Sequence, residues 1–262
     1  DTFRAKVLAT IDLLRGLGDS GTDPALIDAA CARVTEVYGE TLPDGAPLET
    51  ALRDACAAML AMFPQGTTGT SDAAIKAFRD DLANLRAAAE TDRLGRDWKL
   101  WGKLRTLRQS KRGSPTPEGY DAHAEAVMLA AERIIDHPGP HADAVLHLRC
   151  LIDGAQAIMA SYSDRKRTLG VIDFADMIVE AERLLRTNEQ VLDAVLAEVD
   201  CVIVDEFQDT NPVQFALLWR LASRAKRTLL VGDVKQSIMG FQGADPRLTQ
   251  ALVDAFPQNV DP

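Results

Sequence analysis

The hydrophobic pattern changes once along the chain. From residue 1 to about 163, alanine and leucine recur with helical spacing, and clusters of glycine, proline and aspartate interrupt the pattern so that about six helices are outlined. After Gly170, residues 171–185 predict one more helix, and two short apolar runs follow at 201–204 and 228–231. We therefore expect a larger, mainly α-helical part followed by a smaller part that contains strands.

The two apolar runs flank a predicted helix at 212–224. Strands that are apolar throughout are typical of parallel sheets, whose two faces are both buried, and parallel neighbours need a crossover connection. Residues 201–231 therefore predict an α/β unit of strand, crossover helix and strand. A chain of 262 residues, of which 47% are apolar, is near the length at which chains split, so we expect more than one packing unit.

Composition narrows the classes of protein. No stretch approaches the roughly 20 uninterrupted apolar residues of a membrane-spanning helix, and no basic and apolar leader opens the chain, so we expect a soluble, cytoplasmic protein without a membrane partner. The four cysteines are far apart and have no histidine at ligand spacing, which favours core thiols over disulfides or zinc. The formal net charge of −10 limits any contact with nucleic acid to a local surface.

Polar residues gather after both predicted strands. The first strand is followed by Asp205 and Glu206, and the second by a segment that contains Gln236. Ligands of open α/β sheets bind beyond the carboxyl ends of the strands. There, one carboxylate can hold Mg²⁺ and its neighbour can deprotonate a water that attacks a phosphate. Two adjacent acids are also common on ordinary surfaces, so the pair gains weight only from the second segment.

Two long segments carry a resemblance to a known family. VDEFQDTNPVQ at 204–214 resembles motif II, and VGDVKQSIMGFQGADP at 231–246 resembles motif III, of UvrD/RecB-like superfamily 1 DNA helicases. VIDFADMI at 171–178 resembles the segment by which these helicases return from a helical insertion to the motor domain. The residues of the two motifs are most similar to those of AddA-type helicase–nuclease subunits. The helical part matches the family in position and character only.

The resemblance implies a fold, an activity and partners. Residues 1–163 would be a helical, 1B-like insertion domain, and residues 164–262 the C-terminal part of a first RecA-like motor domain. The implied activity is that of an ATP-dependent, 3′-to-5′ DNA helicase or translocase in double-strand break repair and recombination, with ATP and Mg²⁺ as cofactors. The implied partners are single-stranded DNA, a fork or duplex end, and a second, AddB-like helicase–nuclease subunit.

Carried over residue by residue, the resemblance assigns roles at five positions. Asp205 would bind Mg²⁺, Glu206 would be the catalytic base and Gln236 would sense the γ-phosphate. Gln208 would take part in the nucleotide site by linking motif II to its neighbours. Phe241 would stack on a single-stranded base, a contact worth about 1–3 kcal/mol and indifferent to sequence; a buried core phenylalanine is the alternative.

Some features of the family are altered or missing. Met239 stands where many relatives have tyrosine, and Gln242, an expected DNA-binding position, stands where many have arginine. No phosphate-binding GxxxxGK[ST] loop occurs in the sequence, nor a second motor domain or a nuclease motif. We therefore expect an internal fragment of a longer helicase, which by itself neither hydrolyses ATP nor unwinds DNA.

A basic cluster lies in the helical part. Residues 93–112 contain eight lysines and arginines and a single acid, Asp97. The apolar face of a helical wheel holds four residues, Leu94, Trp98, Trp101 and Leu104. We expect these tryptophans in the core. The opposite face, with Arg96, Lys99 and Lys103, is expected to contact duplex phosphates in a salt-dependent manner, and an ordinary solvated helix face is the alternative.

Two other classes of function remain open. The chain could be a non-catalytic DNA-binding or scaffold module on a helicase fold, although the two acids and Gln236 would then have no chemical reason to occur together. It could also be part of a different ATPase that acts on RNA, although the wording of motif III belongs with DNA enzymes.

Overall fold

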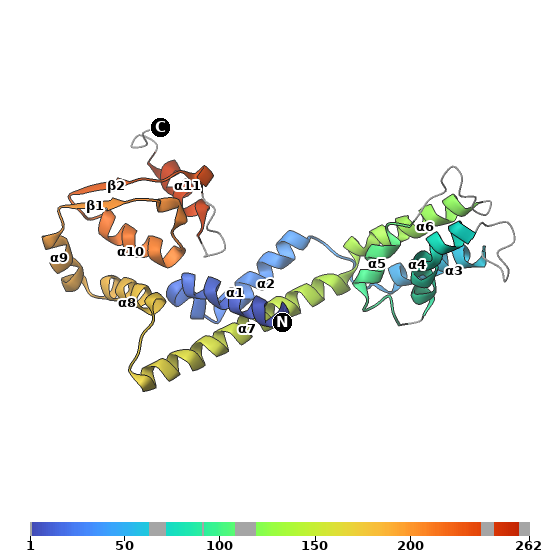
Figure 1. The fold of residues 1–262 in the computed structure, drawn as a ribbon, viewed down its shortest axis with the longest axis horizontal. Coiled ribbons are helices and arrows are strands. Elements are labelled where there is room, and N and C mark those ends of the chain that lie inside the picture. Colours follow the sequence, from blue (N-terminus) through green and yellow to red (C-terminus); the bar gives the residue numbers. More distant parts are fainter. Residues whose placement is uncertain (1, 63–71, 91, 108–118, 237–243, 257–262) are drawn as a thin grey trace. The chain divides into compact units, whose positions relative to one another are not determined.

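The computed structural model describes residues 2–62, 72–90, 92–107, 119–236 and 244–256, and its elements are labelled in Figure 1. The helices are α1 (Thr2–Gly16), α2 (Ala25–Tyr38), α3 (Ala46–Ala61), α4 (Asp72–Ala89), α5 (Trp98–Leu104), α6 (Tyr120–Glu132), α7 (Pro138–Leu169), α8 (Phe174–Thr187), α9 (Glu189–Glu198), α10 (Pro212–Ala222) and α11 (Pro246–Ala255). The short 3-10 helices are η1 (Gly18–Thr22), η2 (Arg133–Asp136), η3 (Phe207–Asp209) and η4 (Val234–Gln236). The strands are β1 (Cys201–Val204) and β2 (Arg227–Leu230).

The chain is mostly helical, with a small two-stranded parallel sheet near its C-terminal end. The helical first part and the strand-containing last part are therefore confirmed. Within the ranges given above, no helix combines the length and the apolar character needed to span a bilayer.

Contacts divide the chain into two compact units. One, which we call the split unit, consists of Asp1–Cys31 and Leu148–Pro262. The other, the inserted unit, is Ala32–His147. The expected boundary between an insertion domain and a motor domain, at residues 163 and 164, lies within α7. That boundary concerns functional domains and stays a prediction.

The inserted unit has a core of its own, built from α3, α4, α5 and α6. Its fully buried side chains include Leu52, Cys56, Met59, Leu85, Leu94, Trp101, Leu104, Tyr120 and Val127. Trp101 donates a hydrogen bond from Nε1 to the carbonyl oxygen of Leu94, at 2.9 Å. Trp98 packs against the same core while its Nε1 donates to Asp143. The expectation of a core tryptophan is confirmed for Trp101, whereas Trp98 is only partly buried at the edge of that core.

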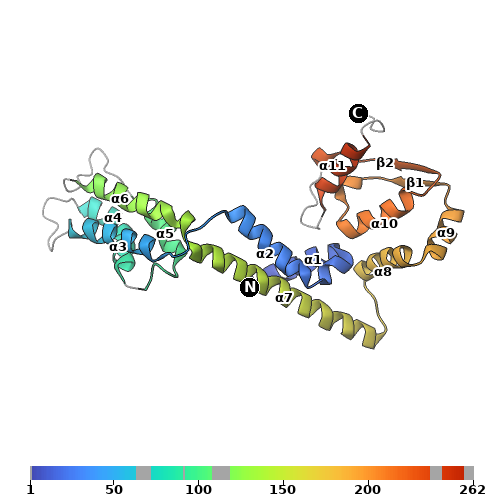
Figure 2. The ribbon, with the colours of Figure 1, turned by 180° about the vertical axis from the view of Figure 1, so that it is seen from behind.

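The sheet of the split unit has the expected strand, helix and strand topology. β1 and β2 are parallel and in register, with Ile203 opposite Leu229, and α10 crosses between them on one face, as both ribbon views show (Figures 1 and 2). α10 begins at a capping box in which the side chains of Asn211 and Gln214 bond each other's backbone N–H groups. Pro212 occupies the first turn, where its missing N–H costs nothing.

Two expectations about burial were wrong. The strands were expected to be buried on both faces, but Ile203 is 68% exposed and Leu229 is 54% exposed. α10 covers the opposite face only, so this pair of neighbouring side chains lies on an open face of the sheet. The cysteines were expected in the core. Cys31 and Cys56 are buried, but Cys150 lies on an exposed part of α7 and Cys201 on the open face of β1.

Candidate functional site

The segments that follow the two strands are joined at the carboxyl edge of the sheet. The backbone N–H of Val231 donates to the carbonyl of Val204 at 2.8 Å, and the N–H of Phe207 donates to the carbonyl of Val231 at 2.9 Å. These bonds continue the parallel ladder beyond the last paired strand residues. The polar residues after β1 and after β2 are therefore brought to the same edge, as the sequence predicts.

Two exposed carboxylates open the segment after β1. Glu206 adopts φ 51° and ψ 41°, and it is the only non-glycine residue with positive φ in the described ranges. This left-handed conformation costs roughly 1–2 kcal/mol for an ordinary side chain. The N–H of Glu206 donates to Oδ1 of Asp205 at 2.9 Å, and the left-handed conformation of Glu206 leads directly into η3. Such local strain is typical of functional sites.

Gln208 joins the two segments through its side-chain amide. It is 1% exposed. Its Nε2 donates to Oε2 of Glu206 at 2.6 Å, and its Oε1 accepts the backbone N–H of Asp233 at 3.0 Å. An amide is suited to this position because it can donate to a carboxylate and accept from an N–H at the same time. The orientation of Glu206 is thereby tied to the segment after β2.

Gly232 makes room for this amide. A Cβ atom at Gly232 would lie 2.5 Å from Oε1 of Gln208 and 3.3 Å from the backbone nitrogens of Gln208 and Phe207. The first distance is shorter than any ordinary contact between heavy atoms. The absence of a side chain at this position is therefore what allows the two segments to approach so closely.

The segment after β2 is organised by Asp233. Its Oδ1 accepts the backbone N–H of Lys235 at 2.8 Å, and its Oδ2 accepts Nε2 of Gln236 at 3.0 Å. The bond from the Lys235 backbone, followed by that from Gln236, lowers the pKa of Asp233, which therefore stays charged. Glu206, Gln208, Asp233 and Gln236 thus form one continuous hydrogen-bonded series across the end of the sheet.

The buried side chain of Phe207 anchors the segment after β1. This ring is buried and lies 5.4 Å from the ring of Phe215 on α10. At the end of η3, Oγ1 of Thr210 donates to the carbonyl of Phe207 at 2.9 Å, and the carbonyl of Thr210 accepts the N–H of Asp245 at 3.3 Å. The turn that follows Asp205 and Glu206 is therefore held in place at Phe207 and again at Thr210.

The carboxylates fit a hard divalent cation. Asp205 and Glu206 offer exposed oxygen atoms beside each other at the end of a strand. Across the residues with a described structure, no three histidine, cysteine, aspartate or glutamate side chains gather into a closed metal site. Mg²⁺ is usually held by one or two carboxylates together with water and substrate phosphates, which is the arrangement these two residues can support.

The remaining predicted site residues fall into two groups. Phe241 and Gln242, and also Met239, lie outside the described residues. Arg96, Lys99 and Lys103 belong to the inserted unit and are exposed. Arg96 lies 3.6 Å from a carboxylate oxygen of Asp92, whereas no ion pair joins Lys99 or Lys103 to another described side chain. The single helical face expected for these three residues is not formed, because α5 begins at Trp98 and Arg96 lies in the turn before it. Asp92 partly neutralises Arg96.

Sequence reasoning missed the two residues that connect the site. Asp233 and Gly232 lie within the segment that resembles motif III, but neither was expected to have a role. The signal available was the Gly-Asp pair directly after an apolar run, because a glycine there permits close approach of two backbones. Gln208, whose side chain accepts the backbone N–H of Asp233, was expected to link motif II to its neighbours, and that role stays a prediction.

Comparison with known proteins adds an independent finding. Residues 147–257 match the family described as UvrD/REP helicase N-terminal domain. Over 102 residues the chain is 32% identical to DNA helicase II of Escherichia coli, which covers 39% of this chain and 14% of that protein. Over 107 residues it is 38% identical to an ATP-dependent helicase/nuclease subunit from Lactobacillus delbrueckii, covering 39% of this chain and 9% of that protein. Over 107 residues it is 37% identical to ATP-dependent DNA helicase PcrA of Staphylococcus aureus, covering 40% and 15%. The chain thus spans only a small share of the length of these relatives.

Proposed function

We propose that the chain is part of the first, RecA-like motor domain of an ATP-dependent DNA helicase, because residues 147–257 match the UvrD/REP helicase N-terminal domain family. The observation that carries the proposal is the hydrogen-bonded series from Glu206 through Gln208 and Asp233 to Gln236. It joins an acid after one strand to an amide after the next, at the edge where open α/β sheets bind ligands.

Each residue of the series then has a chemical task. Asp205, which directly precedes the series, would hold Mg²⁺, and the bound ion would supply positive charge to the phosphates of ATP. Glu206 accepts a proton from the water whose oxygen forms a bond to the γ-phosphorus, while the bond to the leaving ADP oxygen breaks. Gln208 keeps the carboxylate of Glu206 turned toward the sheet edge. Gln236 contacts the γ-phosphate and, through Asp233, relates its presence to the position of Glu206.

The test is DNA-stimulated ATP hydrolysis by the full-length protein that contains these residues. Glu206→Gln should lower kcat by about 100-fold or more, since a positioned base contributes roughly that factor. A glutamine at 206 retains an oxygen that accepts from Gln208, so the loss should be chemical and not structural. Glu180→Gln on the exposed face of α8 is the matched control, because Glu180 pairs only with a neighbouring surface arginine among the described residues. Unchanged turnover in the Glu206 variant would refute the assignment.

The proposed contacts with DNA come from two places. Phe241, with Gln242 beside it, would stack on a base of the single strand. Lys99 and Lys103 on α5, with Arg96 beside them, would contact duplex phosphates. Reversal of charge at Lys99 and Lys103 should weaken binding to a forked DNA and reduce the dependence of that binding on salt. Unaltered affinity at low salt would favour the ordinary solvated face.

Three finer features belong to the same proposal. AddA-type identity rests on the wording of the segment 231–246 and is supported by the relative whose name describes a helicase/nuclease. With it come a role in double-strand break repair and, as partner, a second, AddB-like subunit. Movement from 3′ to 5′ is the direction that the family resemblance implies. Failure to separate the strands of a duplex with a 3′ single-stranded tail, together with opening of a 5′-tailed duplex, would contradict this direction.

The competing function is a non-catalytic scaffold on a helicase fold. The presence of Asp205, Glu206 and Gln236 together argues against it: the bonds of Gln208 would stabilise a scaffold as well, but a site without chemistry has no reason to keep these three side chains. Absence of DNA-stimulated hydrolysis in both the wild-type protein and the Glu206→Gln variant would favour the scaffold.

A further inference from the structure

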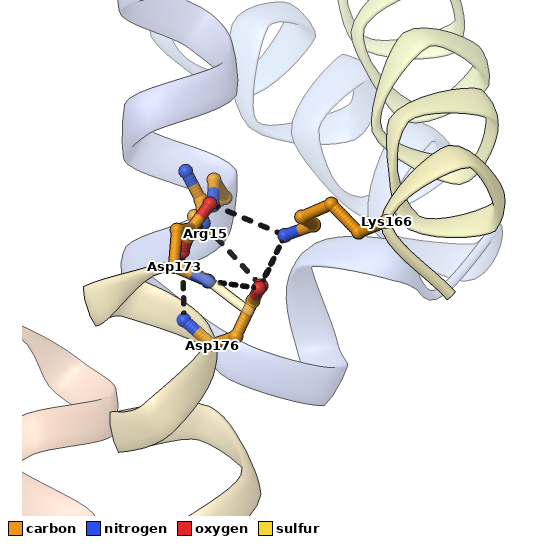
Figure 3. A network of polar contacts seen from close by, with 4 residues as sticks. All are labelled: Arg15, Lys166, Asp173 and Asp176. Atoms are coloured by element: carbon orange, nitrogen blue, oxygen red, sulfur yellow. Dashed lines mark hydrogen bonds and ion pairs between the residues drawn. The ribbon is translucent and has the colours of Figure 1, made fainter. Parts of the chain in front are cut away.

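A four-residue salt-bridge network joins α1, α7 and α8 within the split unit. The guanidinium of Arg15, in the last turn of α1, pairs with Asp173 and lies 3.4 Å from Asp176. The ammonium of Lys166, near the end of α7, lies 3.2 Å from Asp173 and also pairs with Asp176. Figure 3 shows the two cations meeting the two carboxylates from opposite sides. Cations from α1 and α7 thus hold the first turn of α8.

The acids of this network have a second task that fixes their position. Asp173 is the N-cap residue of α8 and Asp176 is its third residue, and each side chain bonds the other's backbone N–H. Burial disfavours charge and would raise the pKa of Asp173, but the backbone of Asp176 and the cations of Lys166 and Arg15 lower it to about 2. Burial also opposes charge on Asp176 and Lys166, and the bonds within the network overcome it by lowering the pKa of Asp176 and raising that of Lys166.

Residues 16–18, which follow Arg15, pack against the start of α10. A Cβ atom at Gly16 would lie 3.6 Å from Cβ of Asn211, which is the N-cap of α10. Gly18 has φ +62°, and a Cβ there would lie 3.0 Å from Cγ2 of Val213. The backbone between α1 and η1 therefore rests directly on the first turn of α10. We call residues 15–18 the α1 elbow.

Ion pairs with α8 hold the α1 elbow on both sides. Arg15 pairs with Asp173 at the start of α8, and Asp19, immediately after the elbow, pairs with Arg186 in the last turn of α8. The α1 elbow is thus fixed between α8 on one side and α10 on the other. Of the four residues in the network, Arg15 is the one that directly precedes the backbone segment in contact with the first turn of α10.

We propose that Arg15 is a positioning residue for the turn that carries Asp205 and Glu206. By holding the α1 elbow against Asn211, it fixes the end of that turn, which is already closed by the bond from Thr210 to the carbonyl of Phe207. The physical part of this inference concerns only contacts within the split unit, and its catalytic consequence rests on the proposed function. The alternative is that the network stabilises α8 alone and has no effect on the acids.

Hydrogen exchange in the 262-residue chain tests the physical part without reference to catalysis. Arg15→Gln should speed exchange of backbone amides in the turn at 205–211 by about tenfold or more, in addition to any change in α8. Arg183→Gln, which removes an arginine that pairs with an exposed glutamate one turn away on α8, should leave the turn unchanged. Faster exchange confined to α8 would overturn the proposal.

A second variant covers the case in which Arg15→Gln unfolds the chain. Asp19→Asn removes the other link between the α1 elbow and α8 but leaves Arg186 its partner Glu182. It should speed exchange in the turn at 205–211 by a smaller factor. An unchanged turn with a displaced elbow, seen as faster exchange at residues 15–18, would equally overturn the proposal.

Steady-state kinetics of the full-length protein test the catalytic consequence. Arg15→Gln should lower kcat for ATP between about tenfold and a hundredfold, as expected for a small displacement of catalytic groups, with little change in KM. Arg15→Lys should restore part of the loss because it keeps one charge. Reduced turnover without faster exchange at 205–211 would refute positioning by Arg15. No turnover in the wild-type protein, with the exchange result as expected, would refute the proposed function and leave the structural link standing.

Discussion

Replacement of Gln208 by leucine is the sharpest test of the hydrogen-bonded series. Leucine is slightly larger than glutamine, so the change opens no cavity beneath the turn. It removes the donor that bonds Oε2 of Glu206 at 2.6 Å and the acceptor that bonds the N–H of Asp233 at 3.0 Å. The substitution therefore isolates the polar role of a side chain that is 1% exposed.

The magnitude follows from where the two lost partners lie. Glu206 is exposed and regains water, so the net loss of its bond is about 0.5–1.5 kcal/mol even though its charge makes the bond strong. The N–H of Asp233 lies in a partly buried contact, and leaving it without an acceptor costs about 1–2 kcal/mol. The sum is about 1.5–3.5 kcal/mol of local stability. It corresponds to roughly 10-fold to 300-fold faster opening of the contact between the segments after β1 and β2, which we call the joint.

Native-state hydrogen exchange of the chain can measure this opening at the amides of Phe207 and Val231, which bond across the joint. The matched control is Gln250→Leu, since Gln250 makes an exposed bond to Asp254 on α11. It should change local stability by less than about 0.5 kcal/mol. Equal exchange in wild type and the Gln208 variant would refute the reasoning, because the joint would then be held by the backbone ladder alone.

A charged analogue separates polarity from shape. Gln208→Glu keeps an oxygen for the N–H of Asp233 but places a second carboxylate beside Glu206. Repulsion should destabilise the joint at neutral pH, and acidification should reverse the effect, because a protonated glutamic acid can donate as the glutamine does. An exchange difference that grows as the pH falls would contradict this account.

Three further predictions concern separate parts of the chain. Gly232→Ala puts a methyl group 2.5 Å from the side-chain oxygen of the same glutamine and should cost about 1–3 kcal/mol, measured as a lower urea midpoint. Because the pKa of Asp173 is lowered to about 2, its charge stabilises the fold above about pH 4 and this contribution is lost as the pH falls to about 2; urea midpoints of Asp173→Asn should depend less on pH across that window. Burial raises the pKa of Cys56 to about 12, so a thiol reagent at about pH 8 should modify the exposed Cys150 and Cys201 and leave Cys56 unmodified until the chain unfolds, as mass spectrometry of the labelled peptides would show.

The local elements of the split unit could be predicted because their signals are local. The apolar run at 201–204 is strand β1 as expected, and the run expected at 228–231 is shifted by one residue, to Arg227–Leu230. The crossover helix, expected at 212–224, ends at Ala222. Boundaries of this kind depend on caps, and the Asn211 cap was strong enough to fix the start of the helix at Pro212.

The place of the first helix could not be predicted in the same way. Residues 1–31 have the helical pattern of the segment that follows them, and they were assigned to the helical first part, yet they pack with residues 148–262. The contact is made by Arg15 with Asp173, which are 158 positions apart. Periodicity reports which face of a helix is buried but carries no information on what buries it. A charged residue at the end of an amphipathic helix has many equally plausible partners.

The pattern of strands predicted the site to the level of the sheet edge, and the family resemblance added Gln208 as a link between motifs. Parallel strands joined by one crossover bring their carboxyl ends together, so residues after each strand must approach one another whatever their identity. What the order of residues cannot give is which groups Gln208 bonds. Gln208 is buried, and a buried polar side chain must satisfy both of its hydrogen-bonding groups, so its two partners follow from geometry: a carboxylate that accepts and a backbone N–H that donates. An acid at this position would repel Glu206 and an apolar residue would bind neither partner. The amide is therefore the side chain that lets the segment after β2 control the orientation of the proposed base.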